Sequence, residues 1–252
     1  MDTVTHIPLH RLALAGVPVI AVVWLLYHWG GEARTALYAF ARMLVQLLLI
    51  GYLLAFIFEA DNAALPMAVL AVMITAASWI SLRLVPGKKT TLLGPALVSV
   101  GVGGGITLAV VTQAVLDLQP WFRPQYLVPL AGMVFANCMN SIALAAERMF
   151  AEAEAAKPYP EARRIALRTA LMPITNSLFA VGLVSLPGMM TGQILAGISP
   201  TMAVRYQIMV MAMLFSASGL SAALFLYGLR NVYEPAAKAP TPEPTQPNHA
   251  VD

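Results

Sequence analysis

Polar side chains that interrupt long apolar segments are the first candidates for chemistry in this sequence. Asn137 and Asn140 are three residues apart, so a helix places them on one face, with the thioether of Met139 next in sequence to Asn140. Polar groups inside a membrane are costly and therefore point to function. Two interpretations are open: the asparagines line a substrate path, or they hydrogen-bond to a neighbouring helix.

A second candidate is the pair Pro187–Gly188, near the middle of the apolar segment 181–210. Proline lacks an amide donor and glycine frees the backbone, so a helix must kink or unwind there. In hydrocarbon, unpaired carbonyl groups are tolerated only against protein or in a water-filled cavity. The pair is therefore either the moving joint of a conduit or a packing kink. The predicted pathway consists of Asn137, Met139, Asn140, Ser185, Pro187, Gly188, Met189 and Met190.

Motifs for catalysis and for hard metal ions are missing from the sequence. It contains no G-x-x-x-x-G-K-[ST], H-E-x-x-H or G-x-S-x-G motif, and no pair of His, Asp or Glu falls within a predicted span. We therefore predict no enzyme activity, no catalytic residue, no metal site and no cofactor bound to this chain. The 14 methionines are either soft ligands, which suit copper(I), or flexible packing residues.

The composition predicts an all-α, polytopic membrane helix bundle. Of the 252 residues, 59% are hydrophobic and 11% are charged, and the mean hydropathy is +0.74. A spanning helix needs roughly 20 residues, so nearly the whole chain can lie in the membrane. The net charge of +3 comes from bases that flank apolar runs, which does not indicate nucleic-acid binding.

About seven spans are predicted within a permease domain at residues 1–233. They lie near 12–29, 35–58, 64–84, 93–116, 126–146, 171–198 and 202–229. The remaining residues, 234–252, form a proline-rich tail that we expect to be disordered.

The distribution of bases predicts the orientation of the spans. Arg83, Lys88 and Lys89 follow the third span, and five more bases lie in the connection 147–168. The alternate connection at 59–61 carries only acids. The positive-inside rule then puts the N-terminus outside and the C-terminus in the cytoplasm.

Two further features concern helix contacts. Gly101 and Gly105 form a G-x-x-x-G pair in the fourth span, which predicts close helix packing. Arg42 and Gln46 share one face of the second span, and Arg42 lies near enough to the cytoplasmic end to extend toward it.

The string G-L-V-S-L-P-G-M-M at 182–190, with Gly192, Pro200 and Tyr206, resembles the FetB-type (YbbM-like) permease family. Similar residues recur at 46–58, at 101–110 and at Gly132, Met133, Asn137 and Met139, so the resemblance covers roughly residues 40 to 225. The resemblance implies the membrane subunit of an ABC exporter in a bacterial inner membrane, with iron or another metal species as its substrate. It also implies a permease homodimer, a separate ATPase that binds ATP-Mg, and plant relatives linked to aluminium tolerance.

The resemblance also suggests where the ATPase binds. An ABC permease of this kind would meet its ATPase at the cytoplasmic connection, where a rigid corner precedes a basic helix. The predicted docking residues are Pro158, Tyr159, Pro160, Arg163, Arg164 and Arg168. The alternative functions are an ion-driven secondary transporter, which the missing intramembrane acid disfavours, and a membrane-embedded enzyme.

Overall fold

The computed structural model describes residues 8–59 and 62–233, and its regular elements there are helices. Within those ranges the one β-type contact is an isolated bridge between Val181 and Ser185. Asp61 and the tail predicted at 234–252 lie outside the described residues.

Six helical segments are long and apolar enough to cross a membrane, at 11–28, 33–58, 64–84, 89–115, 124–154 and 200–228. They coincide with six of the seven predicted spans, so the chain is a polytopic helical membrane protein. The helices are α1 (Leu9–Leu14), α2 (Gly16–His28), α3 (Ala33–Phe58), α4 (Ala64–Ser81), α5 (Lys89–Ser99), α6 (Gly105–Ala109), α7 (Pro124–Glu154), α8 (Tyr159–Ala180), α9 (Gly188–Leu195) and α10 (Pro200–Gly228).

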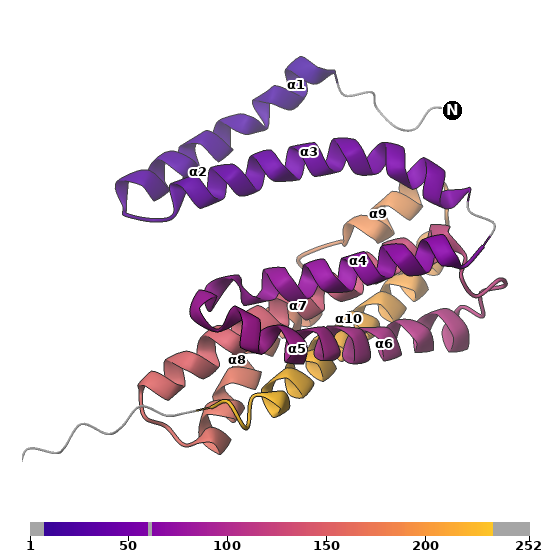
Figure 1. Cartoon of the computed structure of the whole chain (residues 1–252). Coiled ribbons are helices and arrows are strands. Elements are labelled where there is room, and N and C mark those ends of the chain that lie inside the picture. The colour runs from indigo at the N-terminus through magenta and orange to yellow at the C-terminus, as the bar shows by residue number, and fades with distance from the viewer. Residues whose placement is uncertain (1–7, 60–61, 234–252) are drawn as a thin grey trace, which may run out of the picture.

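The remaining predicted span, 171–198, is not one helix. It comprises the end of α8, a non-helical loop and the short helix α9. The hydroxyl of Tyr159 at the start of α8 donates a hydrogen bond to the carbonyl of Leu226 near the end of α10 (2.8 Å). Gln193 of α9 instead lines the same cavity as Tyr126 at the start of α7. The chain therefore returns along the bundle in two helices joined by a loop (Figure 1).

The prediction that Gly101 and Gly105 pack closely against another helix is wrong within the chain. A Cβ on either residue would meet nothing within 4 Å. A Cβ on Gly103 would lie 2.8 Å from the backbone nitrogen of Ser221 on α10, and one on Gly104 would lie 3.0 Å from the ring of Phe135. Residues 100–104 form a π-helical turn, whose wider winding changes which glycines face the neighbouring helices.

The bundle core is formed mainly by α4, α5, α7, α8 and α10. Its fully buried side chains include Ile142 and Met149 on α7 and Phe225 on α10. Small residues such as Ala162 and Ala166 on α8 are also buried, which lets neighbouring helices approach closely.

The N-terminal hairpin of α2 and α3 forms a separate layer beside this bundle (Figure 1). The helix α2 buries no residue, and α3 buries only Ile57. One tie to the bundle is a hydrogen bond of 2.7 Å from the side-chain amide of Gln125 to the carbonyl of Phe58. The hairpin is therefore fastened near the end of α3 and stands apart along most of its length.

Candidate functional site

One face of α7 lines two cavities that lie toward opposite ends of the bundle. Pro129 and Met133 line the first cavity, whereas Asn140 and Leu144 line the second. Asn137 falls between the two sets. These positions are separated by three or four residues, the spacing that keeps side chains on one helix face. The predicted asparagine pair therefore belongs to a stripe that connects the two cavities.

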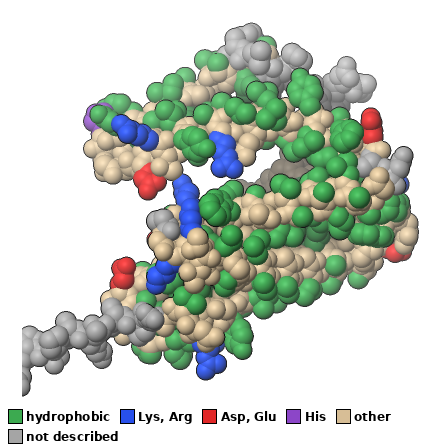
Figure 2. Space-filling model, in the orientation of Figure 1, with side chains coloured by type: hydrophobic (Ala, Val, Ile, Leu, Met, Phe, Trp, Pro, Cys, Tyr) green, Lys and Arg blue, Asp and Glu red, His purple; other side chains and the backbone are tan. Residues whose placement is uncertain are grey.

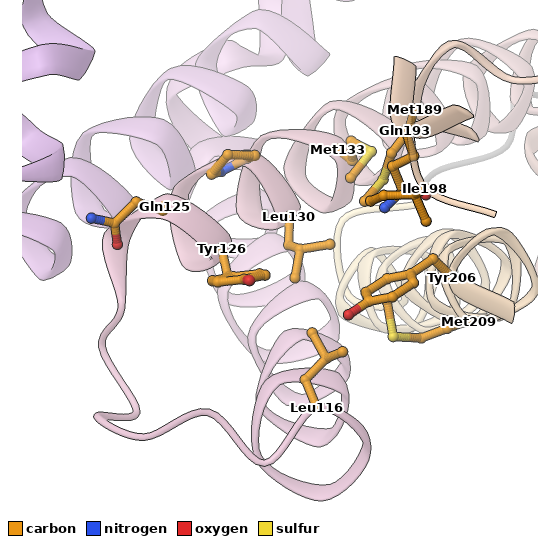
Figure 3. Close-up of a pocket in the computed structure, with 11 residues that line it drawn as sticks. Leu116, Gln125, Tyr126, Leu130, Met133, Met189, Gln193, Ile198, Tyr206 and Met209 are labelled. Atoms are coloured by element: carbon orange, nitrogen blue, oxygen red, sulfur yellow. The ribbon is translucent and has the colours of Figure 1, made fainter. Parts of the chain in front are cut away.

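The first cavity, here called the methionine cavity, has a volume of about 380 Å³. It lies between α7, α9 and α10, and Figure 3 shows Met133, Met189 and Gln193 grouped on one side of it, with Tyr206 and Met209 from α10. The side-chain oxygen of Gln193 is buried and has no hydrogen-bond partner within the described residues. Thioethers and an unpartnered carbonyl oxygen together offer electron pairs to a cation or acceptor sites to a donor.

The second cavity, here called the basic cavity, has a volume of about 750 Å³. It lies between α3, the end of α4, the start of α5, α7 and α8, and its charged lining residues Arg42, Arg83 and Lys89 are all bases. Met139 and Asn140 of the predicted pathway also line it. The side-chain amide of Asn137 donates to the carbonyl of Met133 (2.9 Å), one turn earlier on α7.

Two other residues of the predicted pathway line a third cavity of about 530 Å³ between α8, α9 and α10. Pro187 and Met190 line it together with Gln207, which is 7% exposed. The side-chain oxygen of Gln207 has no hydrogen-bond partner among the described residues. Five of the predicted pathway residues therefore line three different cavities: Met139, Asn140, Pro187, Met189 and Met190. Asn137, Ser185 and Gly188 are not among the lining residues of these cavities.

The loop Val181–Leu186, here called the α8–α9 loop, replaces the predicted kink. The helix α8 ends at Ala180, and Pro187 precedes the first residue of α9, Gly188. The interpretation of the pair as a kink inside one helix is therefore wrong, because the pair begins a new helix. The reversal occurs earlier, at Gly182, whose φ of +84° is a conformation that favours glycine.

The side chains of this loop are unusually exposed for an apolar segment. Leu183 is 90% exposed and Val184 is 85% exposed. At the start of α9, the carbonyl of Pro187 accepts hydrogen bonds from the amide (3.0 Å) and the hydroxyl (3.2 Å) of Thr191. The carbonyl of Ser185 accepts one from the amide of Gly182 (3.0 Å).

The corner between α7 and α8 is held by an ion-pair network that the sequence analysis did not find. The buried carboxylate of Glu152 pairs with Arg148 and with Lys157, at 2.9 Å to the latter. Lys157 also pairs with Glu161 at 3.3 Å. The hydrogen bond to Glu152, followed by the one to Glu161, raises the pKa of Lys157 above its ordinary value. The five-residue interval from Glu152 to Lys157 fits no helical pairing rule, so the sequence gives no signal for this pair.

Two tyrosines fasten the same corner to the end of α10. In addition to the bond of Tyr159 to Leu226, the hydroxyl of Tyr233 donates to the carbonyl of Lys157 (2.8 Å). The two rings meet edge to face with 5.7 Å between their centroids. The predicted corner at Pro158–Pro160 is thus tied to two other parts of the chain.

The basic residues predicted to dock the ATPase lie on α8 directly after this corner. Arg163, Arg164 and Arg168 are exposed. The guanidinium carbon of Arg163 lies 5.6 Å from the centre of the Tyr159 ring, within range of a cation–π contact. The structure therefore presents bases on a helix whose first turn is fixed in position.

Six apolar helical segments long enough to cross a membrane place the chain in the class of polytopic membrane proteins. The chain belongs to the uncharacterised protein family UPF0014, which matches residues 9–233. This confirms the family expected from the sequence, because members of the permease type named above are among its relatives.

Three relatives illustrate the family. A UPF0014 membrane protein of Synechocystis is 34% identical over 225 residues, which cover 83% of this chain and 86% of the relative. The probable iron export permease protein FetB of Escherichia coli is 34% identical, with 77% and 79% covered. The Arabidopsis thaliana protein ALUMINUM SENSITIVE 3 is 31% identical, with 76% and 74% covered. No solved structure matches the chain significantly.

Proposed function

We propose that this chain is the permease subunit of an ABC exporter in a bacterial inner membrane. A separate cytoplasmic ATPase would bind ATP-Mg and supply the energy, and this chain would perform no catalysis itself. One observation carries the proposal: a single face of α7 lines both the basic cavity and the methionine cavity, with Asn137 between them. A transporter needs such a connected pair of sites, because its substrate must be reached alternately from each side.

The orientation proposed for this transport follows from charge. The basic cavity lies at the ends of α4 and α5 that carry Arg83 and Lys89, so the positive-inside rule places it toward the cytoplasm. The methionine cavity then lies toward the outside, as does the N-terminus. Substrate would enter from the basic cavity, pass along the face of α7 and leave through the methionine cavity.

The proposed substrate is iron or another metal species. Support comes from the Escherichia coli relative, which is described as a probable iron export permease. Further support comes from the methionine cavity, where the thioethers of Met133 and Met189 lie beside the unpartnered carbonyl oxygen of Gln193. Such neutral ligands bind a cation weakly enough to release it, which suits a path better than a storage site.

The ATPase would bind at the fastened corner and at Arg163, Arg164 and Arg168. A docking surface that transmits motion has to be stiff, and the ion pairs of Glu152 and the hydrogen bonds of the two tyrosines provide this stiffness. The helix α8 contains 22 residues and is therefore about 33 Å long, enough to connect the cytoplasmic corner to the α8–α9 loop.

A second copy of the permease would cover the α8–α9 loop. Irregular backbone is tolerated at membrane depth only when protein or a cavity covers it, and Leu183 and Val184 are almost fully exposed in the single chain. A homodimer that buries this loop between the two copies would satisfy its backbone and complete the conduit.

Co-purification with an ABC-type ATPase, sought first in the neighbouring gene, tests the proposal. The wild-type chain should bring down the ATPase in a complex whose mass corresponds to two copies of each subunit. Replacing Arg163→Glu and Arg164→Glu should lower the yield of ATPase at least about tenfold, because two docking charges are reversed. The control Arg34→Glu reverses an exposed base at the start of α3, away from the corner, and should leave the yield unchanged. Undiminished binding in the double variant would refute the docking assignment.

A further inference from the structure

An apolar cavity of about 510 Å³ lies next to the basic cavity, between α3, α4 and α5. The two cavities share Arg42, Trp79 and Ile80. The apolar cavity is otherwise lined by small or aliphatic side chains, including Val72 and Leu93. Together they form one space with a cationic end and an apolar end. Figure 2 shows this region as a hollow between the hairpin layer and the bundle, with Lys and Arg side chains on both sides.

We infer that an anionic phospholipid binds in this space. Its phosphate would lie in the basic cavity between Arg42, Arg83 and Lys89, and an acyl chain would fill the apolar cavity along α4. Basic pockets between membrane helices on the cytoplasmic side are the type of site that binds anionic lipid headgroups. This inference does not depend on the proposed transport function.

Charge is the first argument for this ligand. The ion pairs found in the described residues involve Arg148, Glu152, Lys157 and Glu161, so none of the three bases of the basic cavity has a carboxylate partner there. Lys89 instead lies over the ring of Trp79, with 5.2 Å from its ammonium nitrogen to the ring centre. An unpaired base in or near hydrocarbon is costly, and a phosphate neutralises it while accepting its hydrogen bonds.

Depth is the second argument. Arg42 follows the first residue of α3 by nine positions, so its Cα lies about 13 Å along the helix from that end. Arg83 and Lys89 lie on turns at the same end of the bundle, after α4 and at the start of α5. A long arginine side chain that extends toward this end would bring its guanidinium to the level of lipid phosphates. The three bases therefore converge at headgroup depth.

A second copy of this chain fits the same space less well. The Asp and Glu residues of the sequence lie in connections, at helix ends or in the terminal segments, and α4, α5 and α10 carry none. Among the described spanning segments of a second copy, only α7 carries acidic residues, at Glu147, Glu152 and Glu154, and Glu152 is already paired with Arg148 and Lys157. The hairpin is hydrogen-bonded to the bundle at Phe58, and α2 buries no residue, so the opening between them can admit a lipid from the side.

The lipid would complete one wall of the basic cavity. The three bases come from α3, from the turn after α4 and from the start of α5, whereas Met139 and Asn140 come from α7. A phosphate held by the bases therefore leaves the face of α7 open.

Brominated phosphatidylglycerol tests the site, because bromine on an acyl chain quenches a tryptophan that it contacts. Delipidated protein in detergent should lose part of its tryptophan emission on addition of this lipid, and Trp79→Phe should abolish that part. Brominated phosphatidylcholine at the same concentration should quench much less. Replacing Arg42→Gln and Arg83→Gln should weaken phosphatidylglycerol binding roughly 30-fold, since each such base strengthens binding about fivefold. The control Arg34→Gln removes a base outside the cavity and should bind like the wild type.

Two results would overturn the inference: equal quenching by the two lipids, or unchanged binding in the double arginine variant. Competition by inorganic phosphate at millimolar concentration would also overturn it, because it would identify a site for soluble anions. A conservative variant, Arg42→Lys, should retain most of the binding, which separates loss of charge from loss of folding.

Discussion

The two ends of α8 differ in how firmly they are held. At its start, the corner is fixed by three ion pairs around Glu152 and Lys157 and by the hydroxyls of Tyr159 and Tyr233. At its end, the α8–α9 loop exposes Leu183 and Val184, and its own hydrogen bonds are backbone contacts within or next to the loop. A rigid helix thus connects a fastened end to a loosely held one.

This difference indicates where motion would be received and where it would be used. A displaced ATPase would push on the fastened corner, which cannot absorb the displacement locally. The α8–α9 loop can change conformation with little loss of packing, since it is short of buried apolar contacts. The account therefore assigns transmission to the corner and rearrangement to the loop.

Loosening the corner should have the largest effect on assembly. Glu152→Gln removes the charge that holds Arg148 and Lys157, so the yield of co-purified ATPase should fall about tenfold. The matched control is Glu154→Gln, two residues further on, where the side chain is exposed. An equal loss in both variants would show that net charge, and not the fastened corner, determines docking.

Stiffening the loop should have a smaller effect on assembly but a clear one on transport. Gly182→Ala puts a side chain at φ +84°, at a cost of roughly 1–2 kcal/mol. Transport per assembled complex should fall several-fold while ATPase binding stays level. The control Gly51→Ala, on α3, adds its Cβ where nothing lies within 4 Å and should transport normally. Normal transport by Gly182→Ala would remove the loop from the mechanism.

The α8–α9 loop and the long helices show how much of the fold could be predicted from the sequence. Hydropathy alone predicted six of the long helices, because a spanning segment must be continuously apolar. Pro187 and Gly188 correctly indicated a break in the predicted span 171–198. They did not reveal that α8 ends at Ala180, since Val181–Leu186 are as apolar as a helix; the local signal is Gly182, whose φ is +84°.

The candidate site was predictable in composition but not in arrangement. Asn137 and Asn140 share a helix face, as their spacing predicted. Their separation from Met189 and Met190 depends on how α9 packs against α10, which no local pattern encodes. Gly103, and not the predicted Gly101, lies against a neighbouring helix, because a π-helical turn changes the helix period.

The smallest expected effect concerns the pH dependence of the corner. Because its carboxylate partners raise the pKa of Lys157, its contribution to stability is complete below the ordinary lysine value of about 10.4 and disappears as pH rises through the raised pKa. Lys157→Gln should therefore melt at a slightly lower temperature than the wild type at pH 8, and this difference should vanish once the pH is above the raised pKa of Lys157. A difference that persists unchanged at high pH would exclude the ion pairs as its cause.

A flux measurement can test whether this chain carries out ATP-driven export. The permease and the ABC-type ATPase that co-purifies with it would be reconstituted together in vesicles with the ATPase face outward, and uptake of iron would be followed. The account predicts that uptake requires both subunits and ATP-Mg, and that it falls in the Gly182→Ala complex. Uptake that follows an imposed proton gradient and is indifferent to ATP or to the ATPase would contradict the account.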